Sequence, residues 1–103
     1  MNRIDRIKSM EEKMDRAAKA VADAERALES YNAALDDIRT LAAYYASEQW
    51  MRDHDADEAG KIPADLKRGV LSEDGIFDLL EENRGLQLQL AETLAKVIKK
   101  GSF

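Results

Sequence analysis

Residues 4–45, IDRIKSMEEKMDRAAKAVADAERALESYNAALDDIRTLAAYY, decide the fold because their apolar side chains recur at alternating steps of three and four. This spacing is a heptad repeat, which places an apolar stripe along one side of an α-helix. No glycine or proline interrupts the stretch. We therefore expect a helix over about residues 3–47. The stripe consists of Ile7, Met10, Met14, Ala17, Val21, Ala24, Leu28, Tyr31, Leu35, Ile38, Ala42 and Tyr45.

One flank of this stripe carries small or apolar residues where a two-stranded coiled coil would carry charges. This flank reads Lys13, Ala20, Ala27, Ala34 and Leu41, so all but its first residue are small or apolar, and the opposite flank reads Glu11, Ala18, Glu25, Asn32 and Arg39. A wide apolar face of this kind is typical of a helix that contacts several neighbours in a bundle. The outer face is charged and has acid–base pairs four residues apart, such as Asp15 and Lys19. We therefore expect a homodimer formed through the alanine-rich face. Its central residues would be Met14, Val21, Leu28 and Leu35.

A second helix is predicted over about residues 72–100. Ser72 suits the N-cap position, where a side-chain oxygen accepts a free backbone N–H. Leu71 and Ile76 have the spacing of a hydrophobic staple across that cap. Asn83 falls on the apolar stripe of this helix, and we interpret this buried polar residue either as a half-buried amide that sets the helix register or as a residue that binds a ligand or partner.

The two helical patterns predict an all-α protein. We expect a single helical domain over residues 1–103, folded as a long, coiled-coil-like helical hairpin. The connecting loop, residues 48–71, is expected to be ordered and to include a short helical turn that begins at Pro63. A lone hairpin leaves one side of each stripe exposed, so two hairpins are expected to pair into a four-helix bundle.

The composition limits the possible functions. The 103 residues include no cysteine and one histidine, and the formal net charge is −5. Disulfides, thiolate metal ligands and cysteine nucleophiles are thereby excluded. The negative charge disfavours nucleic-acid and anionic-membrane binding, which need concentrated positive charge. No apolar run approaches the roughly 20 residues of a membrane span, and no signal peptide is evident. We expect a cytoplasmic protein that binds neither nucleic acid nor membrane.

The segment 50–74 holds the residues that could carry chemistry. Asp53, Asp55 and Asp57 alternate as at the start of an EF-hand loop, but the glycine and glutamate required at its sixth and twelfth positions are missing. A zinc site is disfavoured because His54 is the only histidine, which leaves only carboxylates to complete the shell. No nucleophile or phosphate-binding motif is present. We therefore expect no enzyme activity, no catalytic residue, no cofactor and no dedicated metal site, while weak divalent-ion binding stays open.

The same segment is long for a connection between two helices, which usually takes about 2–8 residues, and long ordered loops are often functional. We interpret it either as a cap over the end of the hairpin or as a surface that docks a protein partner. Its acidic residues precede its basic ones, so the two groups could pair across the loop. The candidate docking residues are Trp50, Asp57, Glu58, Lys61, Asp65, Lys67, Arg68 and Asp74.

The leading functional prediction is therefore a non-enzymatic helical interaction module that dimerises and docks an unidentified protein partner. The alternative is an acidic inhibitor or nucleic-acid mimic of mobile-element origin, which would occupy a basic groove. Binding by such a mimic would weaken steeply with salt, whereas docking through apolar anchors would not. The acids that a mimic would use are Glu29, Asp36, Asp37, Asp53, Asp55 and Asp57.

The stretch DHDADEAGKIPADLKRGVLSEDGIFDLLEENRGL, residues 53–86, resembles a family of small bacterial proteins known only as a domain of unknown function. The hallmark of that family is AGKxPxDLKRGVLSED, followed by DLL and by EN or DN. The resemblance implies that the connecting segment is the distinctive part of the chain, and it implies no reaction or cofactor. Gly75 and Gly85 depart from the pattern, and they either reduce the rigidity of the second helix or allow a close contact there. The matching positions are Asp57, Glu58, Gly60, Lys61, Pro63, Asp65, Leu66, Lys67, Arg68, Gly69, Ser72, Glu73, Asp74 and Asn83.

Overall fold

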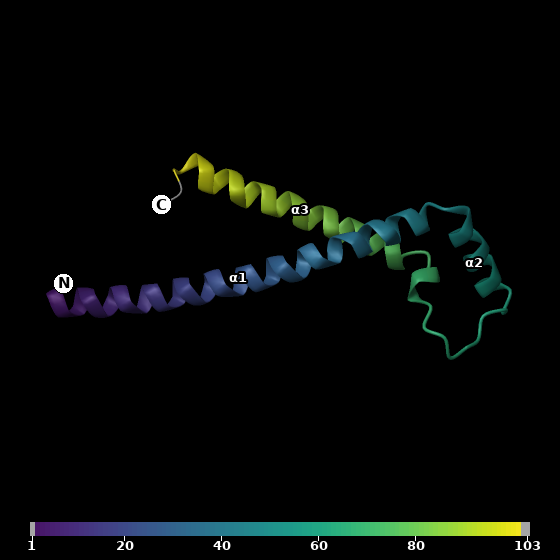
Figure 1. Ribbon diagram of the computed structural model, residues 1–103, viewed down its shortest axis with the longest axis horizontal. Coiled ribbons are helices and arrows are strands. Elements are labelled where there is room, and N and C mark those ends of the chain that lie inside the picture. The colour runs from purple at the N-terminus through teal and green to yellow at the C-terminus, as the bar shows by residue number, and fades with distance from the viewer. Residues whose placement is uncertain (1, 102–103) are drawn as a thin grey trace. The chain divides into compact units, whose positions relative to one another are not determined.

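The structure, a computed structural model, describes residues 2–101 (Figure 1). It contains the α-helices α1 (Arg3–Tyr45), α2 (Glu48–Glu58) and α3 (Gly75–Lys99) and the 3₁₀-helix η1 (Gly69–Leu71). Within the described residues there is no strand, so the predicted all-α class is confirmed. The chain divides into two compact units, residues 1–36 and 37–103. The expectation of one domain for the whole chain stays a prediction.

Helix α1 has nearly the predicted bounds and runs for 43 residues. Its N-terminus is capped by Asn2, whose side-chain oxygen accepts the backbone N–H of Asp5 at 2.8 Å. None of the residues of α1 is buried. Most helical stability in proteins comes from packing of an apolar face rather than from intrinsic propensity. The apolar stripe of α1 therefore lacks, within a single chain, the cover that its pattern predicts.

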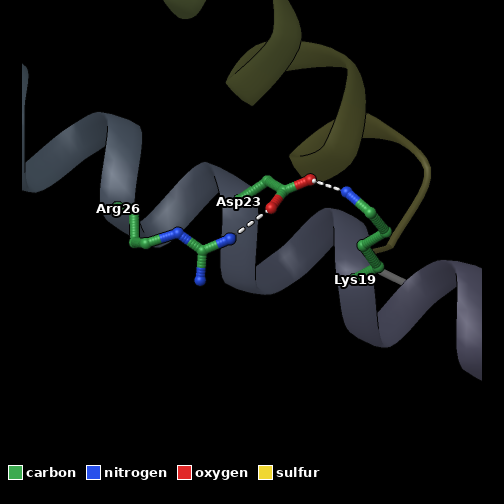
Figure 2. Close-up of polar contacts among 3 residues, drawn as sticks. All are labelled: Lys19, Asp23 and Arg26. Atoms are coloured by element: carbon green, nitrogen blue, oxygen red, sulfur yellow. Dashed lines mark hydrogen bonds and ion pairs between the residues drawn. The ribbon is translucent and has the colours of Figure 1, made fainter.

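The outer face of α1 is marked by a cluster of three charges (Figure 2). Lys19 Nζ lies 2.8 Å from Asp23 Oδ2, and Arg26 pairs with the other oxygen of the same carboxylate. Lys19 thus pairs with Asp23 and not with Asp15, the partner that its spacing suggested. Exposed pairs of this kind contribute about 0–1 kcal/mol, so the cluster identifies the solvated face more than it stabilises the helix.

Helices α1 and α2 are separated by two residues that contain neither glycine nor proline. The hydroxyl of Ser47 donates to Tyr44 O at 2.6 Å and accepts the backbone N–H of Trp50 at 3.2 Å. One side chain therefore satisfies a free carbonyl of α1 and a free amide of α2. The backbone of Ser47 is extended, which turns the chain and begins a second helix.

The expectation that residues 48–71 form a loop is wrong for its first half, which is α2. This helix ends in a Schellman motif, since Lys61 N–H bonds to Ala56 O at 3.0 Å and Gly60 N–H bonds to Asp57 O at 3.0 Å. Gly60 has a φ of +73°, a left-handed conformation that glycine adopts without a steric penalty. The connection proper is therefore much shorter than predicted.

The prediction of a short helical turn that begins at Pro63 is also wrong. Pro63 begins a single turn closed by a bond from Leu66 N–H to its carbonyl at 3.1 Å. The guanidinium of Arg68 donates to the same carbonyl at 3.1 Å. The helical element of this segment instead lies later, at η1.

Helix α3 begins at Gly75, three residues after the predicted start. Ser72 nevertheless organises the start, because its hydroxyl accepts Gly75 N–H at 3.0 Å and donates to Gly69 O at 2.8 Å. A Cβ on Gly75 would collide with Gly69 O and would lie 2.8 Å from Ser72 Oγ. Of the two alternatives for Gly75, the close contact is therefore confirmed. At Gly85 no atom lies within 4 Å of an added Cβ, so no close contact exists there.

The buried core of the described residues consists of Trp50 at 8% exposure, Leu71 at 7% and Ile76 at 2%. Leu71 and Ile76 are the residues of the predicted staple, and Trp50 joins them from α2. The half-buried residues that pack around this core are Leu41, Tyr44, Tyr45 and Leu80. The last turns of α1 and the first turns of α3 thus meet at one small cluster, which α2 completes.

Beyond this cluster the apolar side chains of α3 are exposed. They are Phe77, Leu79, Leu86, Leu88, Leu90, Leu94, Val97 and Ile98. The pairing of two hairpins into a four-helix bundle would cover them and stays a prediction. No helix in residues 2–101 combines the length and the apolar character that crossing a membrane requires.

Candidate functional site

Trp50 is the centre of the segment that the sequence singled out. Its indole Nε1–H donates to Val70 O at 2.9 Å, which ties α2 to η1. The ring of Tyr45 meets the indole edge-on, with centroids 5.0 Å apart. The imidazole of His54 stacks on it at the same centroid distance, with 24° between the ring planes. Trp50 therefore holds three elements together from inside.

Asp53 receives two hydrogen bonds from its neighbours. Tyr44 donates its hydroxyl at 2.6 Å, and Gln49 Nε2 donates at 2.9 Å. The hydrogen bond from Tyr44, followed by that from Gln49, lowers the pKa of Asp53. The same hydrogen bond, together with burial and the carboxylate charge, raises the pKa of Tyr44 to about 12. This pair fastens the start of α2 to the end of α1.

Asp57 forms an ion pair across the connecting segment. Arg68 Nε lies 3.2 Å from Asp57 Oδ1, and the two side chains are 37% and 25% exposed. The predicted pairing of early acids with later bases is thus confirmed for these two residues. Because Arg68 also donates to Pro63 O, one guanidinium fixes both ends of the bend between α2 and η1.

Three side chains with metal-ligand chemistry converge next to Trp50, on which His54 stacks. A nitrogen of His54 and one carboxylate oxygen each from Glu58 and Glu73 lie within 4.8 Å of one another. His54 Nε2 lies 3.6 Å from Glu58 Oε1, one helical turn away on α2. Glu73 comes from the residues that precede α3. Sequence spacing alone associates His54 with Glu58 but not with Glu73.

An apolar pocket of about 400 Å³ lies between the end of α1, η1 and the start of α3. Its lining residues are Leu41, Lys67, Gly69, Val70, Gly75, Ile76 and Leu79. Lys67 supplies the only charged side chain of this lining. The pocket therefore suits an apolar group that carries a negative charge beside it.

The candidate docking residues fall into two groups. Trp50 is buried, and Asp57 and Arg68 are half-buried and form an ion pair with each other. These three residues therefore stabilise the connecting segment through contacts within the chain. The others are exposed and available to a partner: Glu58, Lys61, Asp65, Lys67 and Asp74. Asn83, predicted as a half-buried polar residue of the second helix, is half-buried in α3.

The predicted dimer face is exposed over most of its length. Met14, Val21 and Leu28 are exposed, and Leu35 is half-buried. The three residues occupy corresponding heptad positions, so they lie on one side of α1. The face is therefore available to a second helix.

The acids of the alternative, mimic function differ in availability. Glu29, Asp36 and Asp37 are exposed on α1. Asp53 and Asp57 are half-buried, Asp53 beside Tyr44 and Asp57 beside Arg68. The alternating aspartates also lie on a helix, not on a loop, which removes the EF-hand geometry that their spacing suggested.

Sequence reasoning missed three contributors to the site, Tyr44, Gln49 and Glu73. A signal for the first two was present, because Ser47 followed by Glu48 is an N-cap with an acid in the first turn and predicts a helix start. A helix beginning there places Gln49 and Asp53 one turn apart. Glu73 had no such signal, since only the fold brings it to α2.

Comparison with known proteins gives one family. A model described as "Domain of unknown function (DUF4298)" matches residues 7–93, which include all of α2, η1 and the site residues. No curated protein and no solved structure matches the chain. The expected membership of a family known only as a domain of unknown function is confirmed, while its AGKxPxDLKRGVLSED hallmark stays a prediction. With well over half of its 103 residues matched, the chain belongs to the DUF4298 family.

Proposed function

We propose that this protein is a non-enzymatic helical interaction module that pairs with a second copy of itself through the apolar stripe of α1. The observation that carries the proposal is the exposure of that stripe along a 43-residue helix with no buried residue. A contiguous apolar surface on a helix is typical of a protein interface. The docking of another protein by the connecting segment is the second half of the proposal.

The occupant that fits the stripe is a second α1. Heptad spacing lets two helices interlock their side chains along the whole seam. The stripe and its flanks comprise about 20 residues, which is close to the about 20–30 residues that a standard interface uses on each side. Between residues 18 and 34 the flanking positions carry one charge, Glu25, so two copies meet without strong like-charge repulsion.

The pairing is tested by measuring the mass in solution by sedimentation equilibrium. The natural chain is expected at twice its 11.6 kDa mass. A variant with Val21→Glu and Leu28→Glu should be a monomer, because four carboxylates would meet in the seam of a dimer. Ala33→Glu, on the outer face, is the matched control and should stay a dimer. A natural chain that is monomeric at about 100 µM, which is above the Kd of a stable dimer, would end the proposal.

The docking half of the proposal rests on the pocket between α1, η1 and α3. Val70 and Leu79, both exposed, line it, and Lys67 provides a positive charge. A protein segment that presents an apolar side chain next to a carboxylate matches this lining. The partner proposed here is therefore an acidic-apolar protein segment, held by an apolar anchor and steered by one lysine.

Capture from bacterial lysate, followed by an affinity measurement on the captured protein, tests this half. Lys67→Glu should weaken the affinity at least tenfold, whereas Lys96→Glu near the end of α3 should leave it unchanged. Raising the salt concentration should reduce the affinity only mildly, since the apolar anchor is unaffected by screening. Equal affinities of the two variants would show that the partner does not bind at this pocket. A steep loss with salt would instead favour the acidic-mimic function.

A further inference from the structure

We infer that His54, Glu58 and Glu73 form a binding site for one first-row divalent transition-metal cation, of which Zn²⁺ is the best fit. One nitrogen and two oxygen ligands converge there from α2 and from the residues preceding α3. Such a site goes beyond the proposed dimerisation and docking. The sequence disfavoured zinc because only carboxylates could complete the shell around His54, but it did not show that the fold brings two of them to the imidazole.

The distances suit a tetrahedral shell after small side-chain rotations. Two ligands bound to Zn²⁺ at about 2.0–2.1 Å in tetrahedral geometry lie about 3.3 Å apart. His54 Nε2 and Glu58 Oε1 are already 3.6 Å apart, and all three ligand atoms lie within 4.8 Å of one another. Both glutamates are exposed, so their carboxylates are free to close the remaining distance. Water would complete the shell, as in zinc sites that have three protein ligands.

Of the three candidate ligands, His54 has the most firmly held side chain. The side chain of His54 is 15% exposed and its ring stacks on Trp50, so its orientation is set before any ion binds. Its other nitrogen, Nδ1, lies 3.7 Å from Asp55 Oδ1. A carboxylate near the second nitrogen is the usual companion of a metal-bound histidine. Tyr45 donates its hydroxyl to the backbone oxygen of Glu73 at 3.4 Å, which restrains the third ligand.

The charges of Glu58 and Glu73 favour a bound cation. Among residues 2–101, no lysine or arginine forms an ion pair with Glu58 or Glu73. The neighbouring acids of α2 differ, because Asp53 accepts two hydrogen bonds and Asp57 pairs with Arg68. A divalent ion would neutralise both unpaired carboxylates at once. Glu58 and Glu73, whose carboxylates lie close to the imidazole, are therefore not balanced by a lysine or arginine among residues 2–101.

The mixed ligand set decides which metals fit. Imidazole nitrogen suits Zn²⁺, Fe²⁺, Ni²⁺ and Cu²⁺, whereas Ca²⁺ and Mg²⁺ prefer shells made wholly of oxygen and have higher coordination numbers. A bound ion would join α2 to the residue that precedes Asp74 and α3. The connecting segment would then be fastened by the ion in addition to the Asp57–Arg68 ion pair.

The test is a calorimetric titration of the untagged natural chain with ZnCl₂, with MgCl₂ and CaCl₂ as comparators. The expected result is one Zn²⁺ per chain and affinity for Mg²⁺ and Ca²⁺ at least tenfold weaker. Glu58→Gln and Glu73→Gln should each weaken Zn²⁺ binding at least tenfold. Glu48→Gln, the same change on the exposed start of α2, is the matched control and should bind as the natural chain does.

The single histidine gives an independent readout. Zn²⁺ at its half-saturating concentration should shift the imidazole nitrogen resonances of His54 in the nuclear magnetic resonance spectrum, and Glu73→Gln, which removes no core side chain, should reduce the shift severalfold at the same ion concentration. The inference is overturned if Zn²⁺ binding is absent, if Glu58→Gln and Glu73→Gln bind as tightly as Glu48→Gln, or if half an ion binds per chain. The last result would place the ion between two copies.

Discussion

Arg68 Nε lies 3.2 Å from Asp57 Oδ1, so a residue near the end of α2 is paired with the residue immediately before η1. The same guanidinium donates to Pro63 O, the first carbonyl of the intervening turn. Three points of the connecting segment are therefore held by one side chain. This arrangement makes the segment an ordered structure, although Trp50 and Leu71 are its only buried residues among those described.

The ion pair is expected to contribute measurably to stability. Arg68→Ala and Asp57→Asn should each lower the free energy of unfolding, and the interaction energy from the double-mutant cycle should be about 1 kcal/mol, at the upper end for partly exposed pairs. Arg68→Ala should have the larger single effect because it also removes the bond to Pro63 O. Urea denaturation followed by circular dichroism measures all four chains. Additive single effects would show that the two residues are not coupled.

The hydrogen bond of the buried indole gives a second prediction. Trp50→Phe keeps an aromatic ring but leaves Val70 O without its donor, so the free energy of unfolding should fall by about 2 kcal/mol. Met51→Ala removes a neighbouring but exposed side chain and should change stability by no more than about 0.5 kcal/mol. Thermal and urea unfolding monitored by circular dichroism compare the two. A similar effect at both positions would contradict the central role of Trp50.

Two glycines of α3 should respond to alanine in opposite directions. Gly85→Ala should stabilise the protein by about 1 kcal/mol, because the added methyl group meets no atom and alanine is the better helix former. Gly75→Ala should destabilise it by about 1–3 kcal/mol, since the methyl group collides with Gly69 O. The same unfolding assay reports both changes. Stabilisation by both substitutions would show that α3 does not start against Gly69.

The contact between Tyr44 and Asp53 should be visible in the pH dependence of stability. The lowered pKa of Asp53 stabilises the fold above the unfolded-state value of about 3.9, and this contribution is lost as the pH falls through the folded-state pKa. The raised pKa of Tyr44 stabilises the fold below the unfolded-state value of about 10, and this contribution is lost as the pH rises through about 12. Tyr44→Phe should remove both contributions.

Spectrophotometric titration of the tyrosines checks this prediction directly. One of the three tyrosines of the natural chain should ionise last, near pH 12, and this step should be missing in Tyr44→Phe. Asp53→Asn should move the step to lower pH, because it removes both the charge and the charged acceptor. A late step that persists in Tyr44→Phe would assign it to another tyrosine.

The parts of the fold that local patterns specify could be predicted from the sequence. Heptad spacing gave α1 almost to its ends, and Leu71, Ser72 and Ile76 gave the staple and the approach to α3. The periodic pattern indicates which residues form an apolar face. The stripe of α1 is, however, exposed over most of its length, and the heptad pattern does not identify the surface that would cover it.

The connecting segment was less predictable, for two physical reasons. The hydroxyl of Ser47 caps both the end of α1 and the start of α2. No glycine or proline marks this break in the sequence. The meeting of Glu73 with His54 depends on the tertiary turn made by η1, which no spacing in the chain encodes. The internal pairing of Asp57 with Arg68 was foreseeable from charge order, but the stacking of Trp50 and His54 required α2 to be recognised first.

The buried cluster and the half-buried residues around it include nothing before Leu41. The length of α1 before Leu41 can therefore change without altering the packing of the core. Insertion or deletion of whole heptads there would preserve the phase of the stripe, whereas a change of two or three residues would rotate one half of it away from the other. Natural variation in chain length within this family is therefore expected to come in multiples of seven and to fall before Leu41, where it alters reach without altering the fold.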